Sequence, residues 1–201
     1  MSDNEAPYSG AIKESAKAVG KALDLIKDAS GPIADAYGLI IGDHIHAARD
    51  RRLDQITRKT KKILKDRKLS ETAEVAEQIA IPLLEAAQGE PRDEMQDLWA
   101  RLLANAMDPS RRNDVRPEFI EVLTRLQPND ALVLNSMRQI PEGDAVDAAT
   151  IAPPLKLRGA SVRVSMSKLA TEGCLKQLVS NQGEYYMRTS FGDELLLACS
   201  P

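Results

Sequence analysis

Apolar positions recur at steps of three and four along most of the chain, which predicts a mainly helical protein. Residues 1–10 lack this pattern, and we expect them to be disordered. The segment "AIKESAKAVGKALDLIKDAS" at 11–30 predicts an amphipathic helix that ends at Gly31-Pro32, where proline suits the start of the next helix. In that next segment Ala34, Gly38 and Gly42 recur every four residues, a spacing that lets two helix backbones approach closely.

A long helix with two unlike sides is predicted from about residue 43 to residue 69. One side is apolar apart from a threonine and carries Ile45, Leu53, Ile56, Thr60, Ile63 and Leu64. The opposite side is basic and carries Arg51, Arg58, Lys61, Lys62 and Lys65. This basic side is a candidate surface for anionic lipid or nucleic acid. We favour a solvated face of a packed helix, because no Trp or Phe is interleaved with the cations.

Two further helices are predicted between residues 70 and 107. The first has Ser70 or Thr72 as its N-cap and closes at Gly89. The second begins at Pro91, and its apolar side places Trp99, Leu102 and Leu103 in the core.

The loop "DPSRRNDVRP" at 108–117 has two possible interpretations. Asn105, expected at the rim of the preceding helix, could hold the loop in place as a structural connector, which is the interpretation that we favour. The alternative is an anion site formed by Arg111, Arg112 and Arg116. A short helix containing Phe119 follows the loop.

From Pro128 the pattern predicts three helices, "PNDALVLNSMRQI", "DAATIAPPLKL" and "GASVRVSMSKLATEG", and then a β-hairpin around the turn residues 180–183. Pro153 and Pro154 should shorten or distort the second helix. A terminal helix, "FGDELLLACS", completes the segment. The predicted fold is therefore mainly α, with a helical body at 11–126 and a winged-helix-like module with a small hairpin at 127–201.

The outward side of the third helix of this module is a candidate nucleic-acid or partner surface, because winged helices often read DNA through that helix and the wing. It comprises Arg163, Val164, Ser167 and Lys168, to which the hairpin adds Lys176. The wing tip "SNQG" has no cation to neutralise phosphate, so we expect DNA binding to be weak at best. A protein contact is the favoured use.

Composition and charge agree with a helical protein that meets other proteins. Aromatic residues make up only 3% of the chain, so the core must consist of aliphatic side chains. Residues 1–70 carry 14 Lys and Arg against 10 Asp and Glu, residues 71–147 carry 7 against 16, and residues 148–201 carry 6 against 4. This asymmetry suggests that the regions meet different partners, or each other. We also expect a homo-oligomer, most simply a dimer.

The sequence contains no long apolar run and no secretory leader, so we expect a cytoplasmic protein. Cys174 and Cys199 are then expected to be buried thiols.

Residues suited to catalysis or metal binding do not cluster in the sequence. His44 and His46 would point about 200° apart on a helix, so we expect no metal site. Glu71, Glu74 and Glu77 lack the apolar neighbours that acid/base work requires. No phosphate-binding glycine loop and no nucleophile motif occurs. We expect no cofactor and no enzymatic activity.

Three stretches resemble the bacterial abortive infection alpha family: "GLIIGDHIHAARDRR", "LWARLLANAMDPS" with "VRPEFIEVLTRLQPNDALVL", and "YYMRTSFGDELLLAC". The resemblance covers roughly residues 30–200. It implies a role in phage resistance through abortive infection. It implies no particular reaction and no catalytic residues, and therefore assigns no role to any residue of this chain.

Overall fold

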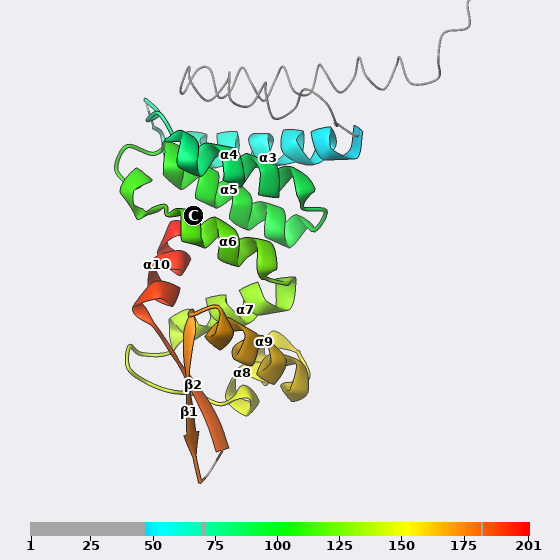
Figure 1. The fold of residues 1–201 in the computed structure, drawn as a ribbon, viewed down its shortest axis with the longest axis vertical. Coiled ribbons are helices and arrows are strands. Elements are labelled where there is room, and N and C mark those ends of the chain that lie inside the picture. Colours follow the sequence, from blue (N-terminus) through cyan, green and yellow to red (C-terminus); the bar gives the residue numbers. More distant parts are fainter. Residues whose placement is uncertain (1–46, 70, 182) are drawn as a thin grey trace, which may run out of the picture. The chain divides into compact units, whose positions relative to one another are not determined.

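The computed structural model describes residues 47–69, 71–181 and 183–201. The predictions for residues 1–46, including the Gly/Ala-rich helix and the two histidines, lie outside these ranges. Within them the protein is mainly helical and has a two-stranded antiparallel hairpin near its C-terminal end, which confirms the predicted fold class (Figure 1). The domain limits and the homodimer stay predictions.

The chain divides into two compact units. The first contains the described residues up to Ile120 together with Pro201, and the second contains Glu121–Ser200. Helix α6, Pro117–Arg125, begins in the first unit and ends in the second. Each unit is built around its own set of packed helices.

In the first unit α3, Ala47–Asp66, packs against both α4, Glu77–Gly89, and α5, Asp93–Met107 (Figure 1). The 3/4 spacing of apolar residues puts each helix's apolar side into one shared core. The buried side chains of this core include Leu53, Ile56, Leu83, Trp99, Leu102 and Leu103. A 3₁₀ turn, η1, Arg112–Asp114, follows α5.

The start of α4 differs from the prediction. The helix begins at Glu77 after an N-cap residue, Ala76, that makes no side-chain cap hydrogen bond, so Thr72 is not its cap. Ser70 lies outside the described residues. The backbone N–H of Ala73 donates to the carbonyl oxygen of Met107 at 2.7 Å. This bond satisfies one of the carbonyl groups left free at the end of α5 and ties the segment before α4 to that end.

Polar groups also join α3 to α5. The Lys59 ammonium pairs with Asp93 and with Asp97, at 2.6 Å in both cases. Partial burial alone would lower the pKa of Lys59, but the hydrogen bonds and charges of the two carboxylates outweigh it and raise the pKa. The buried Thr60 hydroxyl donates to the carbonyl oxygens of Ile56 and Ala100. A polar residue on the apolar side of α3 is therefore accommodated by hydrogen bonding.

The second unit contains three helices, then the hairpin, then a last helix, in the predicted order. The elements are α7, Pro128–Ser136, with the 3₁₀ turn η2, Met137–Gln139; α8, Ala148–Leu155; α9, Gly159–Thr171; β1, Leu175–Ser180; β2, Gly183–Arg188; and α10, Ser190–Ala198. Helix α9 packs against α7, α8 and β1 (Figure 1). Its buried side chains are Val162, Ser165, Met166 and Leu169.

The hairpin has the register of a two-residue turn, with Ser180 opposite Gly183. An isolated antiparallel bridge joins Val146 to Tyr186 and extends the pairing beyond the two strands. The two prolines of α8 lie inside the helix, which ends at Leu155, and its C-cap residue, Lys156, is in the left-handed region at φ 55°.

Candidate functional site

The outward side of α9 and the hairpin form the two walls of a groove of about 730 Å³. Helix α9 contributes the predicted contact residues Arg163, Val164, Ser167 and Lys168. The fifth predicted residue, Lys176, does not line the groove. Its neighbour Gln177 does, because successive side chains of a strand point to opposite faces.

The residues of the other wall were not predicted from the sequence. Glu172 follows the end of α9, and Glu184 and Tyr186 lie on β2. Period-two alternation along "GEYYMR" places Glu184 and Tyr186 on one face of the strand and was the available signal. That face could be matched to α9 only once the hairpin's packing was known.

Charges of both signs meet in this groove. Arg163 and Lys168 supply two cations, and Glu172 and Glu184 supply two anions. Glu172 is held by Arg125 at 2.8 Å. Burial raises the pKa of the Tyr186 hydroxyl, and the nearby Glu184 carboxylate raises it further. The lining side chains therefore carry two positive and two negative charges, and Arg125, outside the lining, pairs with one of the two carboxylates.

Apolar area is present beside these charges. The Val164 side chain is 70% exposed on α9, and Val179 on β1 is 77% exposed. Only Val164 lines the groove. A surface that combines an exposed aliphatic side chain with balanced charges is suited to a protein partner.

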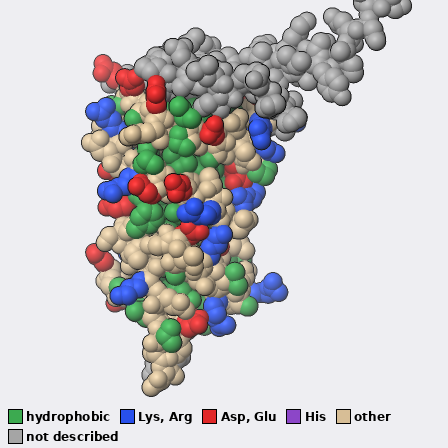
Figure 2. Space-filling view, viewed as in Figure 1, with side chains coloured by type: hydrophobic (Ala, Val, Ile, Leu, Met, Phe, Trp, Pro, Cys, Tyr) green, Lys and Arg blue, Asp and Glu red, His purple; other side chains and the backbone are tan. Residues whose placement is uncertain are grey.

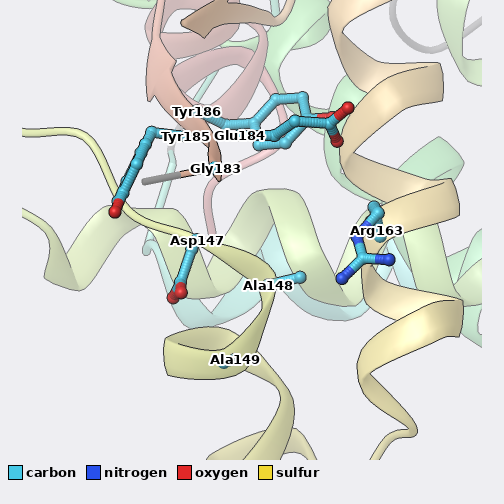
Figure 3. A pocket seen from close by; sticks show the side chains of 8 residues that line it. All are labelled: Asp147, Ala148, Ala149, Arg163, Gly183, Glu184, Tyr185 and Tyr186. Atoms are coloured by element: carbon cyan, nitrogen blue, oxygen red, sulfur yellow. The ribbon is translucent and has the colours of Figure 1, made fainter. Parts of the chain in front are cut away.

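A second cavity, of about 350 Å³, adjoins the groove and shares Arg163, Glu184 and Tyr186 with it. Figure 3 shows the Arg163 side chain reaching from α9 into the same space as Ala148, at the start of α8, whereas Asp147 and Tyr185 lie at the opposite end. Asp147 caps α8 by accepting from the Thr150 amide and hydroxyl, and these hydrogen bonds lower the pKa of its carboxyl group. Arg163 is thus the cation common to both hollows.

The arginine-bearing loop after α5 is fixed at its beginning. Asp108, only 3% exposed, accepts hydrogen bonds from the Ser110 amide and hydroxyl and pairs with Arg67 at 3.2 Å. Asn105 was predicted at the rim but is 1% exposed, and its side-chain oxygen accepts from Arg67 at 2.7 Å. Arg67, which directly follows α3, therefore joins Asn105 and Asp108, so this part of the loop is a structural connector.

The Asp108 contacts predict acid sensitivity. Burial alone would raise the pKa of Asp108, but the Ser110 hydrogen bonds and the Arg67 charge outweigh it and lower the pKa. The resulting stability is fully present above the unfolded-state pKa of about 3.9 and is lost as pH falls through the lower folded-state pKa.

The variant Asp108→Asn should be less stable than wild type at neutral pH by about 1–2 kcal/mol, because its hydrogen bonds are no longer charge-assisted. Its stability should also fall less steeply on acidification, since the neutral amide does not titrate. Urea unfolding measured from pH 6 down to the acid limb would test both points. Identical acid slopes for the two proteins would contradict the role given to Asp108.

The five predicted cations of α3 are all exposed: Arg51, Arg58, Lys61, Lys62 and Lys65. Arg58 pairs with Asp54 one turn earlier at 2.6 Å. On the face drawn in Figure 2, Lys and Arg side chains of the described part are interspersed with Asp and Glu. The use of this row for an anionic membrane surface or nucleic acid stays a prediction.

Both cysteines are buried free thiols, as predicted. Burial, with a smaller contribution from Glu172, raises the pKa of Cys174 to about 12, so this thiol is protonated at neutral pH and is a poor nucleophile. Among the described residues, no three His, Cys, Asp or Glu side chains are grouped so that they could hold a metal ion. No helix within the described ranges is long and apolar enough to cross a membrane.

These features define a mainly helical protein whose second unit presents a mixed-charge groove between a helix and a hairpin. The chain belongs to the abortive infection alpha family, whose model matches residues 48–174. Membership indicates a role in abortive infection, a form of bacterial defence against phage. Neither the curated proteins nor the solved structures give a match.

Proposed function

We propose that this protein is a non-enzymatic effector of abortive infection that acts in the cytoplasm by binding a protein partner through the groove between α9 and the hairpin. The observation that carries the proposal is the balance of two cations and two anions around an exposed valine. A partner segment with an apolar side chain for Val164, a carboxylate for Arg163 or Lys168 and a cation for Glu184 would complement the groove.

DNA binding is the alternative use of a winged-helix-like module. Nonspecific affinity for DNA comes mainly from neutralising phosphates with Lys and Arg. The groove lining also carries two carboxylates, and Glu184, which has no ion-pair partner among the described residues, would repel a phosphate backbone. The arrangement of charges therefore favours a protein partner over nucleic acid.

Two matched charge reversals test the proposal. Lys168→Glu changes a residue that lines the groove, whereas Lys176→Glu makes the same change of charge on the neighbouring hairpin, outside the groove lining. In a phage-sensitive bacterium that expresses each protein at equal level, we expect Lys168→Glu to lose protection and Lys176→Glu to keep it. Efficiency of plating is the measurement.

Electrophoretic shifts of duplex DNA by the same proteins at low salt separate the two uses. No shift is expected. Phosphate contacts respond to charge anywhere on the DNA-facing surface, so a DNA-binding protein should be weakened by both variants. If the wild type shifts DNA, and both variants weaken that shift and lose protection equally, the protein acts by binding DNA and the proposal is wrong. Equal protection by wild type and both variants would exclude the groove as the partner site.

A further inference from the structure

The second half of the arginine-bearing loop borders a cavity of about 370 Å³ in the first unit. Its walls come from the segment that leads into α4, from α4 itself, from the end of α5, and from the residues between η1 and the start of α6. The volume lies at the lower end of the range for small-molecule sites, about 300–1,000 Å³. The cavity belongs to one unit and shares no lining residue with the α9 groove.

Two arginines of the loop line this cavity, Arg112 and Arg116. Both are exposed, and within the described part of the chain neither guanidinium has a hydrogen-bond or ion-pair partner. Arg111, the third arginine of the sequence prediction, is directed elsewhere, since it donates to the carbonyl oxygen of Pro201. The loop is thus fixed by Asp108 at one end and presents two free cations at the other.

The rest of the lining is mainly apolar. Val75, Ile79 and Val115 are buried and form part of the wall, together with Ala76, Ala106 and Pro117. Glu74 is the one carboxylate of the lining, so the two guanidiniums outnumber it. Ala76, the N-cap residue of α4, makes no side-chain cap hydrogen bond and also lines the cavity, so the start of that helix lies at the same wall.

We propose that this cavity binds a small amphiphilic anion, in which a carboxylate or phosphate group is held by Arg112 and Arg116 and an attached apolar group packs against Val75, Ile79 and Val115. Guanidinium groups match the planar oxygens of carboxylates and phosphates through paired N–H donors. The apolar wall distinguishes such a ligand from inorganic phosphate, which would use the cations alone. This site is independent of the proposed protein contact in the second unit.

Isothermal titration of the full chain tests the proposal with four probes: phenyl phosphate, benzoate, inorganic phosphate and phenol. The two amphiphilic anions are expected to bind at millimolar concentration or below. Inorganic phosphate lacks the apolar group and phenol lacks the charge, so each should bind at least about tenfold more weakly, which corresponds to a loss of 1.4 kcal/mol. Comparison of phenyl phosphate with benzoate identifies the preferred anionic group.

The double variant Arg112→Gln, Arg116→Gln should lose at least about tenfold in affinity for the better of the two amphiphilic probes. A matched control, Arg49→Gln with Arg51→Gln, removes the same charge from exposed positions on α3 that do not line the cavity and should bind as wild type does. The positions are exposed in both variants, so we expect the fold to be kept, and circular dichroism checks this.

Two results would overturn the site. One is a lack of binding by both amphiphilic anions to the wild-type protein. The other is equal affinity in the cavity variant and in wild type, which would place the probe elsewhere. Since the phage-protection test uses other residues, the cavity can fail while the groove proposal stands, and the reverse also holds.

Discussion

Replacing Trp99 with alanine should destabilise the first unit by about 3–5 kcal/mol, because it removes the largest buried side chain and leaves a cavity among packed helices. The indole is 1% exposed on α5, and its neighbours in the helix, Leu102 and Leu103, are 0% and 4% exposed. The aliphatic side chains that surround it cannot collapse fully into the space of two fused rings. Such a loss is a large fraction of the stability of a typical domain.

The control is Leu98→Ala in the same helix, where the leucine is only half-buried and the expected loss is about 1 kcal/mol. Urea unfolding followed by far-ultraviolet circular dichroism is the measurement, since Trp99 is the chain's one tryptophan and its replacement removes the fluorescence signal. A loss in Trp99→Ala no greater than in Leu98→Ala would contradict the central place given to the indole.

Phenylalanine at this position separates packing from hydrogen bonding. The Trp99 indole N–H is buried and has no partner among the described residues. The variant Trp99→Phe keeps an aromatic ring and removes this unpaired donor, so part of the packing loss is offset by the removed desolvation penalty. We expect its destabilisation to lie well below that of the alanine variant.

Helices and strands could be predicted where burial on one side imposes a period. Helix α9 and the hairpin illustrate this, because Val162, Met166 and Leu169 recur at helical spacing and the strand residues alternate around a two-residue turn. The ends of helices could be predicted less well from the sequence. The segment before α4 is joined to the end of α5 by the bond between the Ala73 amide and the Met107 carbonyl, whose residues are 34 positions apart, so the sequence carries no local signal of it.

The polar interior could not be predicted for the same reason. Asn105 has the sequence spacing of a rim residue, yet Arg67 reaches it from the end of another helix and covers it. In the candidate sites, too, residues on one helix could be predicted, whereas residues brought to them from other segments could not. The outward positions of α9 followed from helical geometry, whereas the wall that faces them, with Glu184 and Tyr186, comes from a later segment. Likewise, Arg112 and Arg116 were named with Arg111 as an alternative anion site, but Val75 and Ile79 beside the two lining arginines were not predicted.

Gly192 is the one described glycine at which an added Cβ would meet another atom within 4 Å. It lies buried in the first turn of α10, and its amide donates to the hydroxyl of Thr189, which caps that helix. A Cβ at this position would lie 2.2 Å from the carbonyl oxygen of Cys174, far inside van der Waals contact. That carbonyl belongs to the backbone and already accepts from the Thr189 amide and hydroxyl, so it cannot rotate away as a side chain could.

The variant Gly192→Ala should therefore push α10 away from the start of β1, at a cost of about 3 kcal/mol, the upper part of the usual range for overpacking. In a unit of this size that loss lowers the melting temperature by more than about 10 °C. Gly159→Ala is the control, since nothing lies within 4 Å of a Cβ at the first position of α9. Alanine there should be neutral or stabilising by less than about 1 kcal/mol, because it restricts the unfolded chain. Thermal unfolding followed by circular dichroism compares the two, and equal melting temperatures would mean that α10 does not pack against Cys174 as closely as described.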